Sequence, residues 1–383
     1  MKIIVHRGTH QIGGCATEIR TNKSRIIIDV GSELDGNKPL FIPGVTEGKS
    51  DCDAVLFTHY HGDHIGLIES VNDDIPLLMS ELTLDILKLQ NNRQHLFDEK
   101  VIDRISTFVT AKTLTYGDIR ITPFMVDHSA FDSHMFLIES EGKKILHTGD
   151  FRSHGFRGKG LFSTLARYVG DVDVLICEGT TIDRGSIASM SEYELSQNAK
   201  KILQDNKYSF IACASTNFDR IAAICSAVPR GKYCLCDGYQ KSLIDVVTKH
   251  SGSFSRLYQF PKMLTYSDNL LDKMEKHGFC FFVRLGNYLS DYLLDQFKDK
   301  DPLIIYSMWS GYLDEEKIKN AVAGYRIETL HTSGHADVQT IDKLIKTVNP
   351  RFILPIHTND PSSFPNNTAT ILNAADGQEI SII

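Results

Sequence analysis

Short runs of β-branched and other apolar residues, separated by glycine-containing turns, dominate the first 180 residues of the chain. Such runs between turns are typical of strands, and the run at 172–177 is nearly all apolar, which indicates a central strand. The pattern predicts strands at 2–5, 16–20, 25–30, 54–57, 119–126, 135–139, 144–147 and 172–177. Between residues 80 and 108 leucines are interleaved with charged residues, so we expect a pair of covering helices there.

The pattern changes after residue 183. From about 208 to 325 each apolar run is followed by a helical segment, and strict alternation with short loops predicts parallel βαβ units. The last segment returns to the first pattern, with strands at 326–330, 351–355 and 379–383 around a helix at 338–348. We therefore expect residues 1–183 and 326–383 to form one domain, into which residues 184–325 are inserted as a doubly wound α/β domain.

Composition and charge describe an ordinary globular chain of 383 residues, 42% hydrophobic and 23% charged. No apolar run approaches a membrane span, and the first residues read as a strand rather than a signal peptide. The eight scattered cysteines are typical of buried thiols in a reducing compartment, so we expect a cytoplasmic protein without a membrane partner. A net charge of −7 argues against a protein that is basic all over, yet a metal site with a local basic groove can still bind phosphates.

Four potential metal ligands follow the buried run at 55–57 within a few residues. They are His59, His61, Asp63 and His64. His59 and His61 lie two apart on an extended segment, so they point to the same side and can share one cation. The chain turns at Gly62, which allows Asp63 and His64 to face a second cation close by. The stretch predicts a metal site.

More acidic and histidine side chains stand at or beyond the carboxyl ends of predicted strands. They are Asp29, His128, Asp150, Glu178, His335 and His357. Sites in α/β proteins commonly lie past the carboxyl ends of strands, so we expect these side chains to gather near the histidine motif.

In this order the motifs resemble those of the metallo-β-lactamase nucleases with a β-CASP insertion, the group of ribonuclease J and the pre-mRNA 3′-end cleavage endonuclease. The resemblance covers nearly the whole chain. It implies an α/β fold in which a metallo-β-lactamase αββα sandwich carries an inserted doubly wound α/β (β-CASP) domain. It also implies an active site in a cleft between the two domains.

The resemblance further implies a two-metal centre. Its first metal would be bound by His59, His61 and His128, its second by Asp63, His64 and His357, with Asp150 bridging the two and Asp29 supporting them from behind. Nitrogen and oxygen ligands without thiolate suit zinc, and manganese is the alternative.

Two cations about 3.5–4 Å apart can lower the pKa of a shared water and neutralise phosphate oxygens. Asp63, as a ligand, then belongs to the catalytic set. His335 resembles the general acid of the family, which protonates the leaving 3′ oxygen, and Glu178 resembles the acidic partner that orients it. The product would carry a 5′ phosphate.

The substrate is indicated by one position. A histidine at 357 resembles the RNA-acting branch of the group, whereas DNA-repair relatives tend to carry valine there, so we expect single-stranded RNA as the partner. Ser333, Gly334 and Arg152 are the expected substrate-binding residues.

Several alternatives stay open. The chain carries Thr358-Asn359-Asp360 where glycine and an acidic residue are expected, and it lacks the C-terminal extension typical of ribonuclease J. Exonuclease and endonuclease activity are both open, as is the oligomeric state, with a homodimer among the options. The rivals are a metal-dependent hydrolase of DNA or of a small phosphodiester or ester, and an RNA-binding scaffold without activity.

Overall fold

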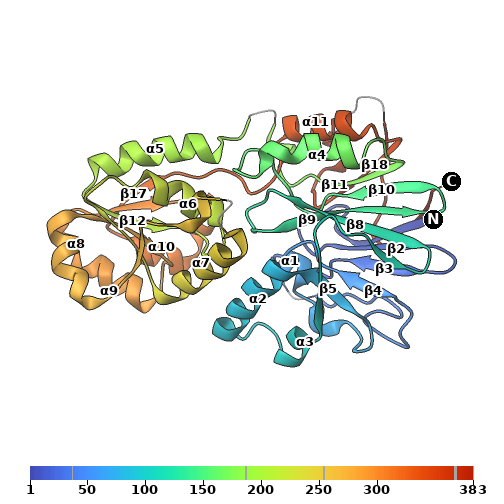
Figure 1. Ribbon diagram of the computed structural model, residues 1–383, viewed down its shortest axis with the longest axis horizontal. Coiled ribbons are helices and arrows are strands. Elements are labelled where there is room, and N and C mark those ends of the chain that lie inside the picture. The colour runs from blue at the N-terminus through green and yellow to red at the C-terminus, as the bar shows by residue number, and fades with distance from the viewer. Residues whose placement is uncertain (37, 186–187, 253–254, 366–368, 383) are drawn as a thin grey trace. The chain divides into compact units, whose positions relative to one another are not determined.

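The chain folds into two compact units. The computed structural model describes residues 1–383 apart from 37, 186–187, 253–254, 366–368 and 383 (Figure 1). Unit 1 comprises Met1–Ser153, Arg157–Ala188 and Gly334–Ile383, and unit 2 comprises His154–Phe156 and Ser189–Ser333.

Unit 1 contains two seven-stranded sheets. The first has the order β20-β1-β2-β3-β4-β5-β6 and the second the order β19-β18-β11-β10-β9-β8-β7. The first sheet consists of β1 (Lys2–Arg7), β2 (Ala16–Arg20), β3 (Arg25–Ile28), β4 (Ala54–Leu56), β5 (Leu77–Ser80), β6 (Ile105–Phe108) and β20 (Glu379–Ser381). The second consists of β7 (Leu114–Tyr116), β8 (Ile119–Val126), β9 (Ser133–Ser140), β10 (Lys143–His147), β11 (Val174–Glu178), β18 (Phe352–Ile356) and β19 (Thr370–Ile371). The helices of the unit are α1 (Gly62–Ile65), α2 (Glu81–Gln94), α3 (Glu99–Asp103), α4 (Leu161–Tyr168) and α11 (Val338–Val348).

The alternation of side chains along the strands builds two cores in unit 1. Val174 and Ile176 of β11 pack into the core between the two sheets. Leu175, next to them in sequence, packs on the other face of the same sheet, against Leu165 of α4 and Leu344 of α11. Because β11 is covered on both faces, its sequence is apolar throughout rather than alternating. These layers confirm the expected sandwich.

Strand direction brings the motif residues of each sheet to one edge. In the second sheet β10, β11 and β18 are parallel neighbours, and β8 runs in the same direction because β9 pairs antiparallel with both β8 and β10. In the first sheet β3 and β4 are also parallel. The motif residues follow these strands directly, so the fold gathers them.

Unit 2 is built on a six-stranded sheet with the order β14-β13-β15-β12-β16-β17, and its pairings are parallel. Its strands are β12 (Tyr208–Ala212), β13 (Tyr233–Cys236), β14 (Met263–Thr265), β15 (Phe279–Val283), β16 (Leu303–Tyr306) and β17 (Arg326–Thr329). Its helices are α5 (Glu192–Asp205), α6 (Phe218–Ala227), α7 (Gly238–Ser251), α8 (Leu271–His277), α9 (Tyr288–Gln296) and α10 (Glu316–Val322). Aromatic rings fill its core. The rings of Phe279 and Phe297, for example, pack edge to face with their centroids 4.8 Å apart. The parallel sheet and its helices confirm the predicted α/β fold class of the inserted domain.

Some elements differ from those expected. Arg326–Thr329, expected to rejoin the first domain, pairs instead with β16, so unit 2 extends to Ser333 rather than to residue 325. Residues 105–108 were expected to be helical but form the edge strand β6. Ser106 and Thr107 are both exposed, and two adjacent exposed polar residues occur in helices as well as in edge strands. None of the helices in the described part of the chain is long and apolar enough to cross a membrane.

Glu18 of β2 is a buried carboxylate that supports the first sheet. Its Oε2 accepts from Arg25 Nη2 at 2.6 Å and lies 2.9 Å from His6 Nε2. Burial alone would raise the pKa of Glu18, but the hydrogen bonds to His6 and Arg25 outweigh it and hold the pKa below the ordinary 4.5. A depressed pKa means that the carboxylate stabilises the fold above about pH 4.5, and that this stabilisation is lost as the pH falls through the folded-state pKa.

We expect Glu18→Gln to lower the free energy of unfolding by about 3 kcal/mol at pH 7, because it leaves Arg25 without its buried counter-charge. Urea unfolding at pH 7 and pH 4 checks the expectation. The difference in the free energy of unfolding between variant and wild type should be smaller at pH 4. The exposed Glu47→Gln is the matched control. An equal destabilisation at both pH values would contradict the role of the charge.

Candidate metal centre

The histidine motif is held in place by backbone contacts rather than by a long helix. After β4, His59 and His61 lie on extended chain, and α1 is a single turn that carries Asp63 and His64. The carbonyl of Asp63 accepts from Cys15 N at 2.9 Å, and the carbonyl of His64 accepts from Val30 N at 2.8 Å. Gly31 lies against this turn so closely that a Cβ there would stand 1.7 Å from the carbonyl oxygen of Asp63. Only glycine permits this approach.

Two sets of ligand atoms lie side by side at the strand ends. His59, His61 and His128 form one set. The other set comprises Asp63, His64, Asp150 and His357. Within each set the ligand atoms are all within 4.8 Å of one another, a spacing that a bound cation can close.

Asp150 stands between the two sets. Its Oδ2 lies 3.9 Å from His59 Nε2 and 3.7 Å from His128 Nε2 on one side. On the other side it lies 3.2 Å from His64 Nε2 and 3.8 Å from His357 Nε2. One carboxylate oxygen therefore faces imidazoles of both sets, as a bridging ligand must.

Each of four imidazoles is oriented through its Nδ1. The Nδ1 partners are Thr58 Oγ1 for His59 (3.0 Å), Asp29 Oδ2 for His64 (2.8 Å), Gly334 O for His128 (2.7 Å) and Thr180 Oγ1 for His357 (2.7 Å). Such contacts fix the ring and leave Nε2 as the ligand atom. Asp29 and His357 also adopt left-handed backbone conformations, with φ of 61° and 51°, which marks both as constrained positions.

The Nε2 atom of His59 is buried and has no hydrogen-bond partner among the described residues, and the buried Nε2 of His64 has only the Asp150 carboxylate, at 3.2 Å and without hydrogen-bond geometry. Burying an unsatisfied polar nitrogen is costly, and a metal ion would satisfy both atoms. The donor set consists of imidazole and carboxylate, which zinc accepts readily. The residues present thus fit the metal centre that the sequence motifs indicate.

Burial and nearby charges shift the histidine pKa values of the two sets in different directions. Burial lowers the pKa of His59 and of His128, and it lowers the pKa of His61 to about 4, so these rings are neutral and ready to ligate. Burial would also lower the pKa of His64, but Asp150 and Asp29 outweigh it and raise that pKa. The carboxylates on this side of the centre would attract a second cation, which would replace the proton that they favour on His64.

His335 and Glu178 form a pair at the edge of the centre. His335 Nδ1 lies 3.1 Å from Glu178 Oε2 and 3.6 Å from Asp150 Oδ2. Glu178 is fully buried and is held by Phe151 N at 2.9 Å and by Thr180 Oγ1 at 2.7 Å. Burial alone would lower the pKa of His335, but Glu178 and Asp150 outweigh it and raise the pKa to about 9. The imidazole is protonated at neutral pH.

The three residues expected to bind substrate lie in different environments. Arg152 is fully buried, and its Nε donates to Asp127 Oδ1 at 3.1 Å, so it supports the fold and does not reach a substrate. This corrects the expectation, which rested on a basic residue following a strand. Gly334 presents its carbonyl to His128, and the Ser333 carbonyl accepts from His154 Nε2 at 2.8 Å.

Residues that the motifs did not single out complete the centre. Thr58 and Thr180 each contact a candidate ligand. Thr58 stands one residue before the histidine motif and Thr180 two residues after Glu178, so proximity in sequence was the available signal. The Cys15 Sγ lies within 4.8 Å of the ligand atoms of His64 and His357, but nothing in the sequence around it suggested this.

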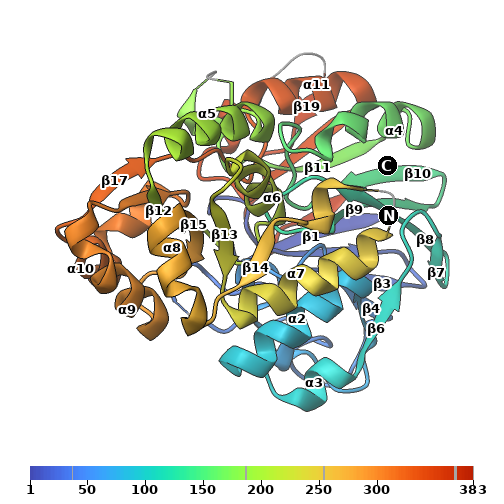
Figure 2. The ribbon, with the colours of Figure 1, turned by 60° about the vertical axis from the view of Figure 1, so that its left-hand side comes forward.

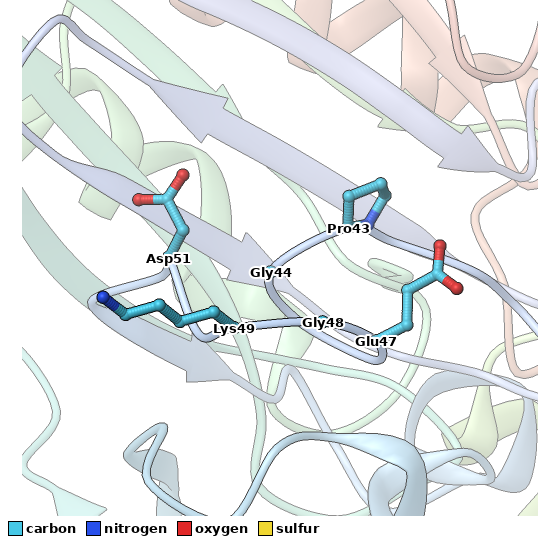
Figure 3. Close-up of a pocket in the computed structure, with 6 residues that line it drawn as sticks. All are labelled: Pro43, Gly44, Glu47, Gly48, Lys49 and Asp51. Carbon is cyan, nitrogen blue, oxygen red and sulfur yellow. The ribbon is translucent and has the colours of Figure 1, made fainter.

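Surface hollows elsewhere do not share this chemistry. One of them lies in the loop after β3, and Figure 3 shows the residues that line it: Pro43, Gly44, Glu47, Gly48, Lys49 and Asp51. The two acids share this rim with a lysine and with no histidine, so the hollow offers no comparable set of ligands.

Comparisons with known proteins agree with this geometry. Residues 24–207 match a beta-lactamase superfamily domain, and residues 324–363 match a Zn-dependent metallo-hydrolase RNA specificity domain. Ribonuclease J of Mycoplasma pneumoniae is 24% identical over 93% of this chain and 67% of its own length. Ribonuclease J of Helicobacter pylori is 23% identical over 93% of this chain, which spans 56% of that relative. The chain thus spans about two thirds or less of these relatives.

A crystal structure of a protein of unknown function from Enterococcus faecalis V583 has the same fold. The TM-score is 0.80 at 22% identity, and the superposition covers 99% of both chains. Together with the two matched domains, these likenesses identify the chain as a ribonuclease J-like member of the metallo-β-lactamase superfamily with β-CASP architecture, and as a metal-dependent hydrolase.

Proposed function

We propose that the protein is a two-metal ribonuclease that hydrolyses single-stranded RNA and leaves 5′-phosphate ends. The observation that carries the proposal is the position of Asp150 Oδ2, within 3.9 Å of imidazoles from both ligand sets. RNA is favoured as substrate because a matched domain is described as an RNA specificity domain and the relatives are named ribonuclease J.

Each residue has a part in this proposal. His59, His61 and His128 would hold one cation and Asp63, His64 and His357 the other, Asp150 would be a ligand shared by the two, and Asp29 orients His64. Zinc is the proposed metal, with manganese as the alternative. The two ions would supply Lewis acidity to the phosphate and a nucleophilic water near neutral pH.

The proton for the leaving group comes from the chain itself. Glu178 engages Nδ1 of His335 at 3.1 Å, so Nε2 is the nitrogen that delivers a proton to the departing 3′ oxygen. The carboxylate of Glu178 stabilises the protonated ring and is itself fixed by Thr180 and the backbone of Phe151. The Gly334 carbonyl orients His128, and Ser333 stands beside it as a candidate contact for the RNA strand.

Digestion of end-labelled RNA tests the function. We expect zinc-loaded protein to cleave a single-stranded RNA and Asp63→Ala to leave it intact. Release of mononucleotides from a 5′-monophosphorylated end would establish an exonuclease, and discrete internal fragments an endonuclease. Failure to cleave RNA while DNA or a small phosphodiester is consumed would overturn the RNA assignment.

A further inference from the structure

The strand β17 leaves one edge of the unit 2 sheet open. It is the last strand in the order and, among the strands of the described residues, pairs with β16 alone, in the register Leu303↔Arg326 to Tyr306↔Thr329. Figure 2 shows it at the margin of this sheet. All four of its residues are exposed, and Ile327 is 41% exposed although it is apolar. An exposed edge strand is a template for pairing with another strand.

The ladder with β16 determines which backbone groups face the open edge. Leu330 N donates to Tyr306 O at 2.9 Å, so residue 330 directs its backbone toward β16. Alternate residues of a strand direct their N–H and C=O groups to the same neighbour, so Arg326 and Glu328 also face β16. Ile327 and Thr329 therefore present their N–H and C=O groups to the outside.

We propose that β17 pairs antiparallel with the β17 of a second copy of this chain, with Ile327 opposite Ile327 of that copy. Both residues direct their polar backbone groups outward, so they can exchange two hydrogen bonds as a hydrogen-bonded pair. The same register places Arg326 opposite Glu328 of the second copy, and by symmetry Glu328 opposite the second Arg326. A two-fold interface requires such self-complementarity.

Charge selects this register over its neighbour. A shift that placed Glu328 opposite Glu328 would oppose like charges, which destabilises a cross-strand pair. Glu328 forms no ion pair within 4 Å among the residues described in unit 2. Arg326 contacts only an exposed acid by ion pairing, Asp301, at 2.8 Å, and its side chain is 52% exposed. Arg326 also donates to Asn206 Oδ1 at 3.3 Å, so it would exchange exposed partners for Glu328 of a second copy, whereas Glu328 has no ion pair to give up within the described part of unit 2.

The small size of the strand sets the strength of the association. Four residues cannot bury the roughly 800 Å² per partner of a standard interface, so we expect a dimer with a dissociation constant of about 10 μM or weaker. The dimer should therefore form reversibly as the protein concentration rises.

Sedimentation equilibrium of the full chain between 1 and 500 μM tests the pairing. Glu328→Arg and Arg326→Glu each place like charges opposite each other twice, so each should weaken the dimer at least about tenfold. An equimolar mixture of the two variants should form a heterodimer, because Arg-Ile-Arg then faces Glu-Ile-Glu. The double variant R326E/E328R should recover the wild-type dissociation constant.

Matched controls change the same charges on exposed positions of the neighbouring helix α10. Lys319→Glu and Glu316→Arg should leave the association unchanged, and circular dichroism verifies that every variant is folded. A chain that stays monomeric at 500 μM overturns the proposal. So does a dimer that Glu328→Arg does not weaken, or a mixture of the two single variants that fails to associate.

Discussion

Asp150→Asn should reduce RNA hydrolysis by at least about 10³-fold and lower the bound zinc to one equivalent or less. The substitution preserves the shape of the side chain but removes the negative charge that lies 3.2–3.9 Å from imidazoles of both ligand sets. A neutral amide no longer offsets the mutual repulsion of two closely spaced cations.

Metal content measured by plasma mass spectrometry after dialysis separates this effect from a loss of chemistry alone. Asp183→Asn, at an exposed position beyond β11, is the matched control and should retain two equivalents of zinc and full activity. If Asp150→Asn kept both metals and more than a tenth of the activity, the bridging role would be wrong. A variant that lost both zinc ions and remained folded by circular dichroism would agree with it.

The layered fold was predictable because its strands bury alternate residues on opposite faces. β11 shows this directly, since Val174 and Leu175 pack into different cores and the strand reads as apolar throughout. The edge strands were harder to predict. β6 exposes Ser106 and Thr107, so its local pattern carries no sign of burial and only its pairing partner makes it a strand. The strand at β17 was predicted, but its pairing with β16 was not, because Arg326 and Glu328 are exposed and do not indicate which sheet the strand joins.

The candidate ligands were predictable for a different reason. A metal centre needs several imidazoles and carboxylates, and these residue types are rarely placed together after strands by packing alone. The supporting contacts have no such signature. Thr58, Thr180 and the Gly334 carbonyl act through one hydrogen bond each, and threonine is common in loops. Arg152 shows the converse error, because an arginine beside a motif can be buried in an ion pair as easily as exposed to a substrate.

His335→Ala should reduce the cleavage of RNA by about 10²–10⁴-fold while leaving two zinc ions bound. His335 contacts Glu178 at 3.1 Å and lies outside both principal ligand sets, so its loss removes a proton donor and not a metal. The leaving group decides the size of the effect. A p-nitrophenyl phosphodiester expels a phenolate that needs no proton, so the same variant should lose less than about tenfold on that substrate.

The pH profile gives a second, independent readout of this role. A general acid works only while protonated, so wild-type activity should fall as the pH rises through the pKa of His335, which the contact with Glu178 raises. Glu178→Gln removes a carboxylate that raises this pKa, so its activity should fall at a lower pH than that of the wild type. His95→Asn is the matched control, at an exposed left-handed position at the end of α2. It should leave the pH dependence of RNA cleavage unchanged. Equal losses of His335→Ala on RNA and on the p-nitrophenyl ester would show that the imidazole positions the substrate and does not donate the proton.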